Sequence, residues 1–165
     1  MRLLLIADTH IPRRARDLPP EVWAEVDRVD LVIHAGDWVD LDTLDRLELR
    51  SERMVGVAGN NDGPELHARL GEVARIELES VRVAVVHETG ASTGRTERMA
   101  REYPDVDLLI FGHSHIPWDT TAATGLRMLN PGSPTDRRRQ PAGSFMIATI
   151  TAGAVTDVEL RAVGR

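Results

Sequence analysis

The sequence predicts an α/β fold, because short apolar runs alternate with longer amphipathic stretches along the chain. The 165 residues contain no internal repeat, no low-complexity tract and no segment rich in proline, glycine and serine that could serve as a linker. We therefore expect a single domain over residues 1–165, which is long enough to bury a sizeable core without disulfides.

In the first third of the chain, each apolar run leads into polar residues and then into a helix signal. Residues 3–7 and 31–33 are continuously apolar, as the buried strands of a parallel sheet are. Pro19-Pro20-Glu21 predicts a helix start, since proline is tolerated in a first helical turn. Asp40 can cap a second helix with leucines on one side, and residues 54–58 form a third strand.

The rest of the chain predicts hairpins as well as one more helix, so we expect parallel and antiparallel strands together. The predicted segments are, in order, a strand at 75–78, a turn at Glu79-Ser80, a strand at 81–86, a helix at 94–103, a strand at 106–111, and strands within 127–160 that turn at Pro131-Gly132 and Ala152-Gly153.

Composition narrows the classes of function. The net charge of −6 and an aromatic content of 4% argue against binding to extended nucleic acid. The absence of cysteine excludes thiolate metal sites and suits a reducing cytoplasm, and the first apolar run is too short to span a membrane. We expect a cytoplasmic protein that acts on a small substrate and leave homo-oligomers open. The clusters Arg13-Arg14-Arg16 and Arg137-Arg138-Arg139 are typical of solvated surface.

Polar residues that can bind metals follow five of the predicted strands directly. In α/β sheets, sites gather beyond the carboxyl ends of strands, so these residues should meet. Their imidazole, carboxylate and amide donors suit a mixed nitrogen and oxygen metal site. The candidate ligands are Asp8, His10, Asp37, Asn60, His87, His113 and His115.

Each member of this set also has an ordinary structural explanation. Asp37 alone could cap a helix, and Asn60 alone could belong to a turn. We interpret His34 as a residue that orients a loop and His67 as a surface residue, whereas Trp38 could line a pocket or pack in the core. The recurrence at successive strand ends favours a metal site for the set as a whole.

The ordered motifs resemble the calcineurin-like metallophosphoesterase family. They are Asp8-x-His10, Gly36-Asp37, Gly59-Asn60-x-Asp62, His87 and Gly112-His113-x-His115. The compact length and the segment Asn130-Pro131-Gly132-Ser133 are similar to the small bacterial and archaeal phosphodiesterase branch, which is related to the retromer-subunit scaffold proteins.

The resemblance implies two mixed sheets packed as a sandwich between helices, in a four-layer α/β/β/α arrangement. It also implies two divalent ions that Asp37 bridges. One ion would be held by Asp8, His10, Asp37 and His115, and the other by Asp37, Asn60, His87 and His113.

The implied activity is hydrolysis of a phosphoester by a metal-activated bridging hydroxide, with Asn60, Asp62 and His113 as catalytic residues. The resemblance favours Mn²⁺, with Fe²⁺, Zn²⁺ and Ni²⁺ as alternatives. Many relatives have histidine where this chain has Asn61, and asparagine cannot act as an acid. We therefore expect a phosphodiesterase for substrates with good leaving groups, in which water, Asp62 or a metal-bound group protonates the leaving group. One of Arg137, Arg138 and Arg139, which follow the Asn-Pro-Gly-Ser segment, could contact the substrate phosphate rather than only solvent. The alternative to an enzyme is a metal-binding interaction scaffold with little or no turnover.

Overall fold

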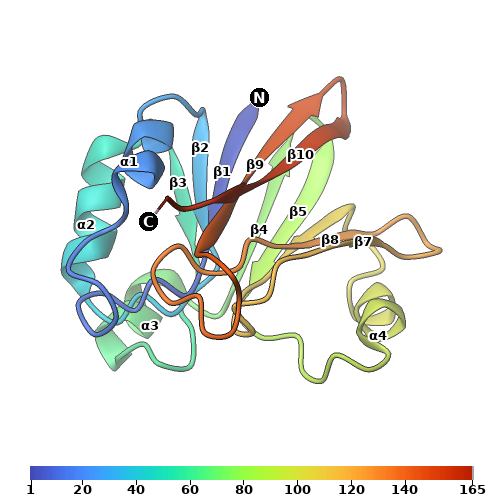
Figure 1. The fold of residues 1–165 in the computed structure, drawn as a ribbon. Helices are drawn as coiled ribbons and strands as arrows, with labels where there is room; N and C mark the ends of the chain where they lie inside the picture. The colour runs from blue at the N-terminus through green and yellow to red at the C-terminus, as the bar shows by residue number, and fades with distance from the viewer. Residues whose placement is uncertain (165) are drawn as a thin grey trace.

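The computed structural model describes residues 1–164 and contains two five-stranded sheets packed face to face, with helices on the outer surfaces (Figure 1). The first sheet has the order β10-β9-β1-β2-β3 and the second the order β4-β5-β6-β8-β7. The strands are β1 (Arg2–Ile6), β2 (Leu31–His34), β3 (Met54–Gly56), β4 (Val73–Leu78), β5 (Val81–Val86), β6 (Leu108–Ile110), β7 (Trp118–Thr121), β8 (Arg127–Asn130), β9 (Ser144–Thr151) and β10 (Ala154–Ala162). The helices are α1 (Pro20–Val26), α2 (Leu41–Arg50), α3 (Pro64–Leu70) and α4 (Arg95–Glu102).

Each sheet has a parallel centre and antiparallel edges. In the first sheet β1, β2 and β3 run parallel, and β9 and β10 add to β1 as an antiparallel hairpin. In the second sheet β5, β6 and β8 run parallel, with β4 and β7 antiparallel at the two edges. The mixed order that hairpins and crossovers predicted is therefore confirmed.

Three apolar clusters fill the spaces between four layers. Leu3 and Leu5 of β1 point into the cluster between the two sheets, whereas Leu4 and Ile6 point to the cluster beneath α1, α2 and α3. The third cluster joins the second sheet to α4. Because both faces of β1 are covered, residues 3–6 of that strand are all apolar, and the continuous run was the correct signal of a central strand. The predicted α/β/β/α sandwich is confirmed.

Most predicted elements are present, with shifted bounds. The side chain of Asp40 caps α2 by accepting a hydrogen bond from Thr43 N at 3.1 Å. The turn between β4 and β5 has positive φ angles at Glu79 and Ser80, as expected of a tight hairpin. The third strand ends at Gly56 rather than at residue 58, because its ladder with β2 stops there. Helix α3 and the edge strand β7 were not predicted.

A buried carboxylate ties the ends of the chain to α1. Glu25 is buried, and its oxygens accept hydrogen bonds from Arg2 Nη1 and Arg161 Nη1, both at 2.6 Å. Burial raises the pKa of Glu25, but the two guanidinium groups outweigh it and hold the pKa below its usual value. This ion cluster fastens β1 and β10 to the helix that covers them. None of the helices in residues 1–164 is both long and apolar enough to cross a membrane.

Candidate metal centre

The structure brings all seven candidate ligands to one place, where the parallel strands of both sheets end. The residues come from loops that follow five strands, as the sequence predicted. They are Asp8 and His10 after β1, Asp37 after β2, Asn60 after β3, His87 after β5, and His113 and His115 after β6.

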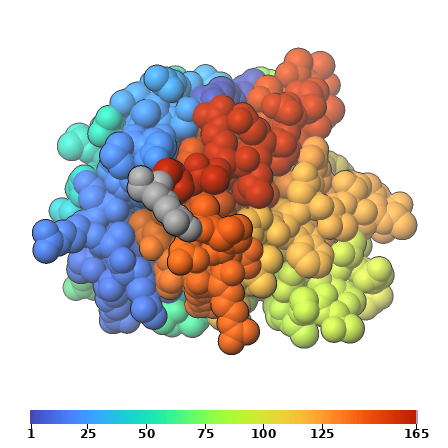
Figure 2. All heavy atoms as spheres, viewed as in Figure 1, coloured from blue at the N-terminus to red at the C-terminus, as the bar shows by residue number. Residues whose placement is uncertain are grey.

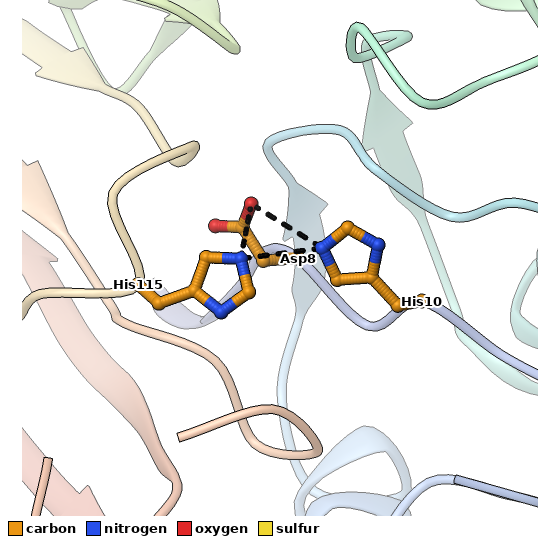
Figure 3. A group of neighbouring side chains, drawn as sticks. All are labelled: Asp8, His10 and His115. Atoms are coloured by element: carbon orange, nitrogen blue, oxygen red, sulfur yellow. Dashed lines mark hydrogen bonds and ion pairs between the residues drawn. The ribbon is translucent and has the colours of Figure 1, made fainter. Parts of the chain in front are cut away.

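Asp8, His10 and His115 form the first group, which is buried (Figure 3). Nε2 of His115 lies 3.3 Å from Asp8 Oδ1 and 3.2 Å from Nε2 of His10. The nitrogen of His10 is 4.0 Å from the same carboxylate oxygen. One oxygen and two nitrogens therefore face a common point, which is the arrangement of a metal-binding group.

Asn60, His87 and His113 form the second group with Asp37. Nε2 of His87 lies 3.4 Å from Asp37 Oδ1 and 3.1 Å from Asn60 Oδ1. Nδ1 of His113 lies 3.0 Å from the same Asn60 oxygen, and its side chain is 48% exposed. Asp8 also belongs here by distance, since Asp8, Asp37 and His87 offer ligand atoms within 4.8 Å of one another.

The carboxylate of Asp37 lies between the two groups. Its Oδ2 is 3.5 Å from Nε2 of His10, and its Oδ1 is 3.4 Å from Nε2 of His87. Burial raises the pKa of Asp37, but His87 and two N–H groups of Asn61 outweigh it and hold the pKa well below the usual value. The group is therefore an anion placed between two imidazoles.

The outer hydrogen bonds of two histidines fix the direction of their free lone pairs. Nδ1 of His87 donates to the carbonyl of Ala35 at 2.7 Å, and Nδ1 of His115 donates to the carbonyl of Asp136 at 2.6 Å. With Nδ1 protonated, Nε2 of each neutral ring directs a lone pair at carboxylate or amide oxygens inside the cluster. This contact between acceptors is favourable only with a cation between them, either a proton or a metal ion.

The pKa values of two histidines and one carboxylate oxygen without a hydrogen-bond partner within residues 1–164 also indicate that a cation belongs in the cluster. Burial lowers the pKa values of His87 and His115, but neighbouring carboxylates outweigh it, so both pKa values are raised. In addition, Asp8 Oδ2 is buried and has no hydrogen-bond partner among the described residues. A buried carboxylate oxygen without a partner is costly, and a divalent cation would satisfy it. The residues present therefore fit a metal centre.

The backbone of the centre is unusual as well. Half of the ten non-glycine residues with positive φ in residues 1–164 are candidate ligands, and sparsely populated backbone conformations cluster at functional sites. Gly36 has a φ of +90°, and a Cβ added there would lie only 2.7 Å from His87 Nδ1. The five ligands are Asp8 (φ 55°), His10 (46°), Asp37 (62°), His113 (68°) and His115 (57°).

His34 and Trp38 support the centre from the core. The ring of His34 is fully buried, with Nδ1 accepting a hydrogen bond from Gly36 N at 3.2 Å and Nε2 lying 3.0 Å from the Thr9 hydroxyl. Trp38 stacks on this ring at 3.5 Å and donates Nε1–H to the carbonyl of Val57 at 2.8 Å. His34 therefore orients loops, as we interpreted it, and of the two alternatives for Trp38 core packing is correct.

Asn61 and Asp62 contact Asp37 and its surroundings. Asn61 donates its backbone N–H to Asp37 Oδ1 at 2.8 Å and its side-chain N–H to Oδ2 at 2.7 Å. Asp62 accepts backbone N–H groups from Asp37 at 3.0 Å, Gly59 at 2.7 Å and Val39 at 2.7 Å. Burial raises the pKa of Asp62 despite these bonds. Both residues hold Asp37 in place, and the catalytic role expected for Asp62 stays a prediction.

A cavity of about 400 Å³ adjoins the second group, and Asn60 and His87 are among its lining residues. Glu72, Glu88 and Glu102 also line it, together with apolar side chains, and none of the arginines within residues 1–164 does. The interpretation of His67 as a surface residue was wrong in part: its side chain is 35% exposed, it lines this cavity, and its Nε2 lies 3.1 Å from the carbonyl of Gly59.

Sequence reasoning missed the residues that hold the first group from outside. The hydroxyl of Ser133 donates to the Asp8 carbonyl at 2.7 Å, and that of Thr135 donates to the following carbonyl at 2.6 Å. The carbonyl of Asp136 fixes His115, as described above. These residues lie more than a hundred positions from Asp8, and as turn-forming types after a proline–glycine pair they give no local signal of this contact.

Comparisons with known proteins agree with the fold and the centre. The sequence pattern of the calcineurin-like phosphoesterase superfamily domain matches residues 1–153. A probable metallophosphoesterase of Methanothermobacter thermautotrophicus is 36% identical over an alignment of 171 positions, gaps included. The alignment covers 99% of this chain and 94% of that protein.

Two solved structures show the same similarity over nearly the whole chain. The solution NMR structure of a Thermotoga maritima protein is 36% identical with a TM-score of 0.77, covering 98% of both chains. Wild-type Vps29 of Entamoeba histolytica, in a complex with Zn²⁺, is 25% identical with a TM-score of 0.78, covering 99% of this chain and 100% of that one.

Proposed function

The chain belongs to the calcineurin-like phosphoesterase superfamily, and from this premise we propose that it is a binuclear metal-dependent phosphodiesterase. The observation that carries the proposal is the position of Asp37. Its two carboxylate oxygens face the buried imidazoles of His10 and His87, one in each group, at 3.5 and 3.4 Å. A carboxylate held in this way is suited to bridge two divalent ions.

The donor sets support two ions of intermediate hardness. Seven side chains supply four imidazole nitrogens and three carboxylate or amide oxygens, with no thiolate, which suits manganese, iron, zinc or nickel. We propose Mn²⁺ as the activating ion because the bridging donor is a hard carboxylate. One ion would be held by Asp8, His10, Asp37 and His115, and the other by Asp37, Asn60, His87 and His113.

When bound, the two ions would polarise the phosphate oxygens and lower the pKa of water at the site. The chain's own groups then position the substrate. The amide oxygen of Asn60 faces His87 and His113, which leaves its N–H groups to donate to a phosphate oxygen. His113 is half-exposed at the rim of the centre, where its ring can contact both the second ion and the substrate.

Two features support a diester rather than a monoester as the substrate. Asn61 has no ionisable proton and its side chain is engaged with Asp37, while both oxygens of Asp62 accept backbone N–H groups. Asn61 therefore cannot protonate a leaving group, and Asp62 could do so only by giving up a backbone hydrogen bond, so alcohols that leave readily as anions are favoured. The cavity beside Asn60 is lined by three glutamates, which repel a doubly charged monoester more than a singly charged diester.

Hydrolysis of bis(p-nitrophenyl) phosphate by metal-stripped protein, with and without Mn²⁺, tests the proposal. We expect activity only with the metal, and a loss of at least about 100-fold in Asp37→Asn, since a bridging ligand matters more than the outer hydrogen bonds of metal sites. Asp42→Asn, at an exposed carboxylate in the first turn of α2, is the matched control. Full activity in Asp37→Asn would contradict the mechanism, and faster turnover of an alkyl monoester than of the aryl diester would contradict the substrate class.

A second candidate function is that of a metal-binding interaction scaffold with little or no turnover. It is favoured by the similarity of this chain to Vps29 of Entamoeba histolytica, whose structure was determined as a Zn²⁺ complex. Binding of two ions per chain, together with no hydrolysis across a panel of mono- and diesters, would favour the scaffold over the enzyme.

A further inference from the structure

The loop over residues 131–143 is fastened to the metal centre, although it carries no candidate ligand. Ser133 and Thr135 bond to the backbone just after β1, and the carbonyl of Asp136 fixes the ring of His115. The carboxylate of Asp136 also lies 3.3 Å from Arg14 Nε. This ion pair joins the loop to the segment after β1 that contains Arg14. Figure 2 shows this loop, in orange, on the molecular surface beside the blue N-terminal segment. The loop that carries the three consecutive arginines is therefore held against the centre.

Arg138 differs from the two arginines beside it. Arg137 folds back onto its own loop, since its Nη1 donates to the carbonyl of Gln140 at 2.6 Å. Within residues 1–164, neither Arg138 nor Arg139 has an ion pair or a side-chain hydrogen bond, but of the three arginines only Arg138 has a positive φ, and its value of 46° is rare for a bulky side chain. Arg138 also lies two residues from Asp136, whose carbonyl contacts His115, so its guanidinium group is within reach of the centre.

We propose that Arg138 is a substrate-binding residue that contacts the phosphate group of the phosphoester held at the metal centre. The inference rests on the proposed function and assigns to one side chain the recognition of the anionic part of the substrate. The nearby carboxylate of Asp136 is paired with Arg14 and leaves Arg138 free.

The chemistry of the guanidinium group suits this role. It stays protonated at every physiological pH, and its planar fork can donate two parallel hydrogen bonds to the oxygens of one phosphate. The positive φ of Arg138 is a sparsely populated backbone conformation, and such conformations cluster at functional sites. A lysine at this position would supply the charge but not the paired hydrogen bonds.

The test compares Arg138→Gly and Arg138→Lys with the matched control Arg139→Gly. Inorganic phosphate is the probe, measured by calorimetry on the Mn²⁺-loaded protein and as a competitive inhibitor of bis(p-nitrophenyl) phosphate hydrolysis. We expect Arg138→Gly to weaken phosphate binding about 10-fold and to raise KM more than it lowers kcat, because a charge-assisted bidentate contact is lost. The lysine variant should lose about 3-fold and the control about 2-fold or less.

Glycine suits a positive φ, so Arg138→Gly should melt at the same temperature as the wild type or higher. A merely structural arginine would show the opposite, with a lower melting temperature and unchanged phosphate binding, and would overturn the proposal. Equal effects in Arg138→Gly and Arg139→Gly would also overturn the proposal, since they would show only that positive charge near the centre attracts phosphate. A wild-type protein that binds no phosphate would overturn it as well. If the wild type binds phosphate but hydrolyses nothing, calorimetry still decides the role of Arg138 while the enzymatic function fails.

Discussion

Replacement of Gly59 by alanine should damage the metal centre without removing any ligand. A Cβ added to Gly59 would lie 2.5 Å from the backbone nitrogen of Asp37 and closer still to its Oδ1. Asp37 cannot easily retreat, because its backbone N–H bonds to Asp62 at 3.0 Å and its carbonyl accepts the N–H of His10 at 3.0 Å. The Gly59→Ala change therefore presses on the carboxylate proposed to bridge the two ions.

The size of the effect follows from the overlap. Ordinary van der Waals contact begins near 3.4 Å, so the added carbon is about 0.9 Å too close and something must shift by nearly that distance. Metal and catalytic sites need their ligands held to within about 0.5 Å. We therefore expect the affinity for Mn²⁺ to fall at least about 10- to 100-fold, as it does when the support of metal ligands is disturbed.

The free energy of unfolding should fall as well. Overpacking of a filled region costs about 1–3 kcal/mol, which corresponds to a loss of about 2–12 °C in melting temperature for a domain of this size. Gly63→Ala is the matched control, because Gly63 lies four residues further along the same loop and an added Cβ there meets nothing within 4 Å. Its φ of −79° is accessible to alanine.

Titration calorimetry with Mn²⁺ and thermal melts of the metal-free proteins measure the two effects. The reasoning would be refuted if Gly59→Ala bound two Mn²⁺ ions with wild-type affinity and melted at the same temperature as Gly63→Ala. A variant that melts lower but binds normally would show that the backbone shifts away from Asp37 and not toward it.

Three further predictions concern the core, the ion cluster and the protonation of the centre. Trp38→Phe removes the hydrogen bond to the carbonyl of Val57 and part of a buried ring, so differential scanning calorimetry should show a loss of about 2–3 kcal/mol. Glu25 has a lowered pKa in the folded state, so its stabilising contribution is full above the unfolded pKa of about 4.3 and disappears as pH falls through the folded value. Urea unfolding should therefore show Glu25→Gln as less stable at neutral pH, with the gap closing in acid. The raised pKa values of His87 and His115 stabilise the metal-free protein at low pH, a contribution lost as pH rises through them, and make protons compete with metal. Calorimetry in buffers of different ionisation enthalpy should detect proton release on Mn²⁺ binding, and the affinity should fall at least about 10-fold from pH 8 to pH 6; a pH-independent affinity would contradict this.

Much of the fold could be predicted because both faces of the central strands are buried. This burial makes residues 3–6 of β1 and 31–33 of β2 continuously apolar, and the polar residues after these runs then mark the strand ends. Helix α3 was missed because it is short and follows a turn-like Asn-Asn-Asp-Gly run, although Pro64 in its first turn was an available signal. Strand β7 lies at an edge with half of its residues exposed, so its sequence carries no apolar run.

The candidate site could also be predicted only in part. The candidate ligands could be picked out because each lies within a few residues of a strand end, and the topology of two parallel-centred sheets brings these ends together. The bonds from Ser133 to Asp8 and from Asp136 to His115 were not predictable, because they join distant segments and involve a hydroxyl or a backbone carbonyl. Nor does the sequence show that Arg137 of the run of three folds back onto the carbonyl of Gln140.

The most direct test of the central claim is electron paramagnetic resonance of the Mn²⁺-loaded protein, combined with metal analysis. If Asp37 bridges two ions, wild-type protein should bind two Mn²⁺ per chain and give the spectrum of an exchange-coupled pair. Asp37→Asn should give at most isolated Mn²⁺ signals, whereas Asp42→Asn should match the wild type. A single uncoupled ion in the wild type, or an intact coupled pair in Asp37→Asn, would contradict the account.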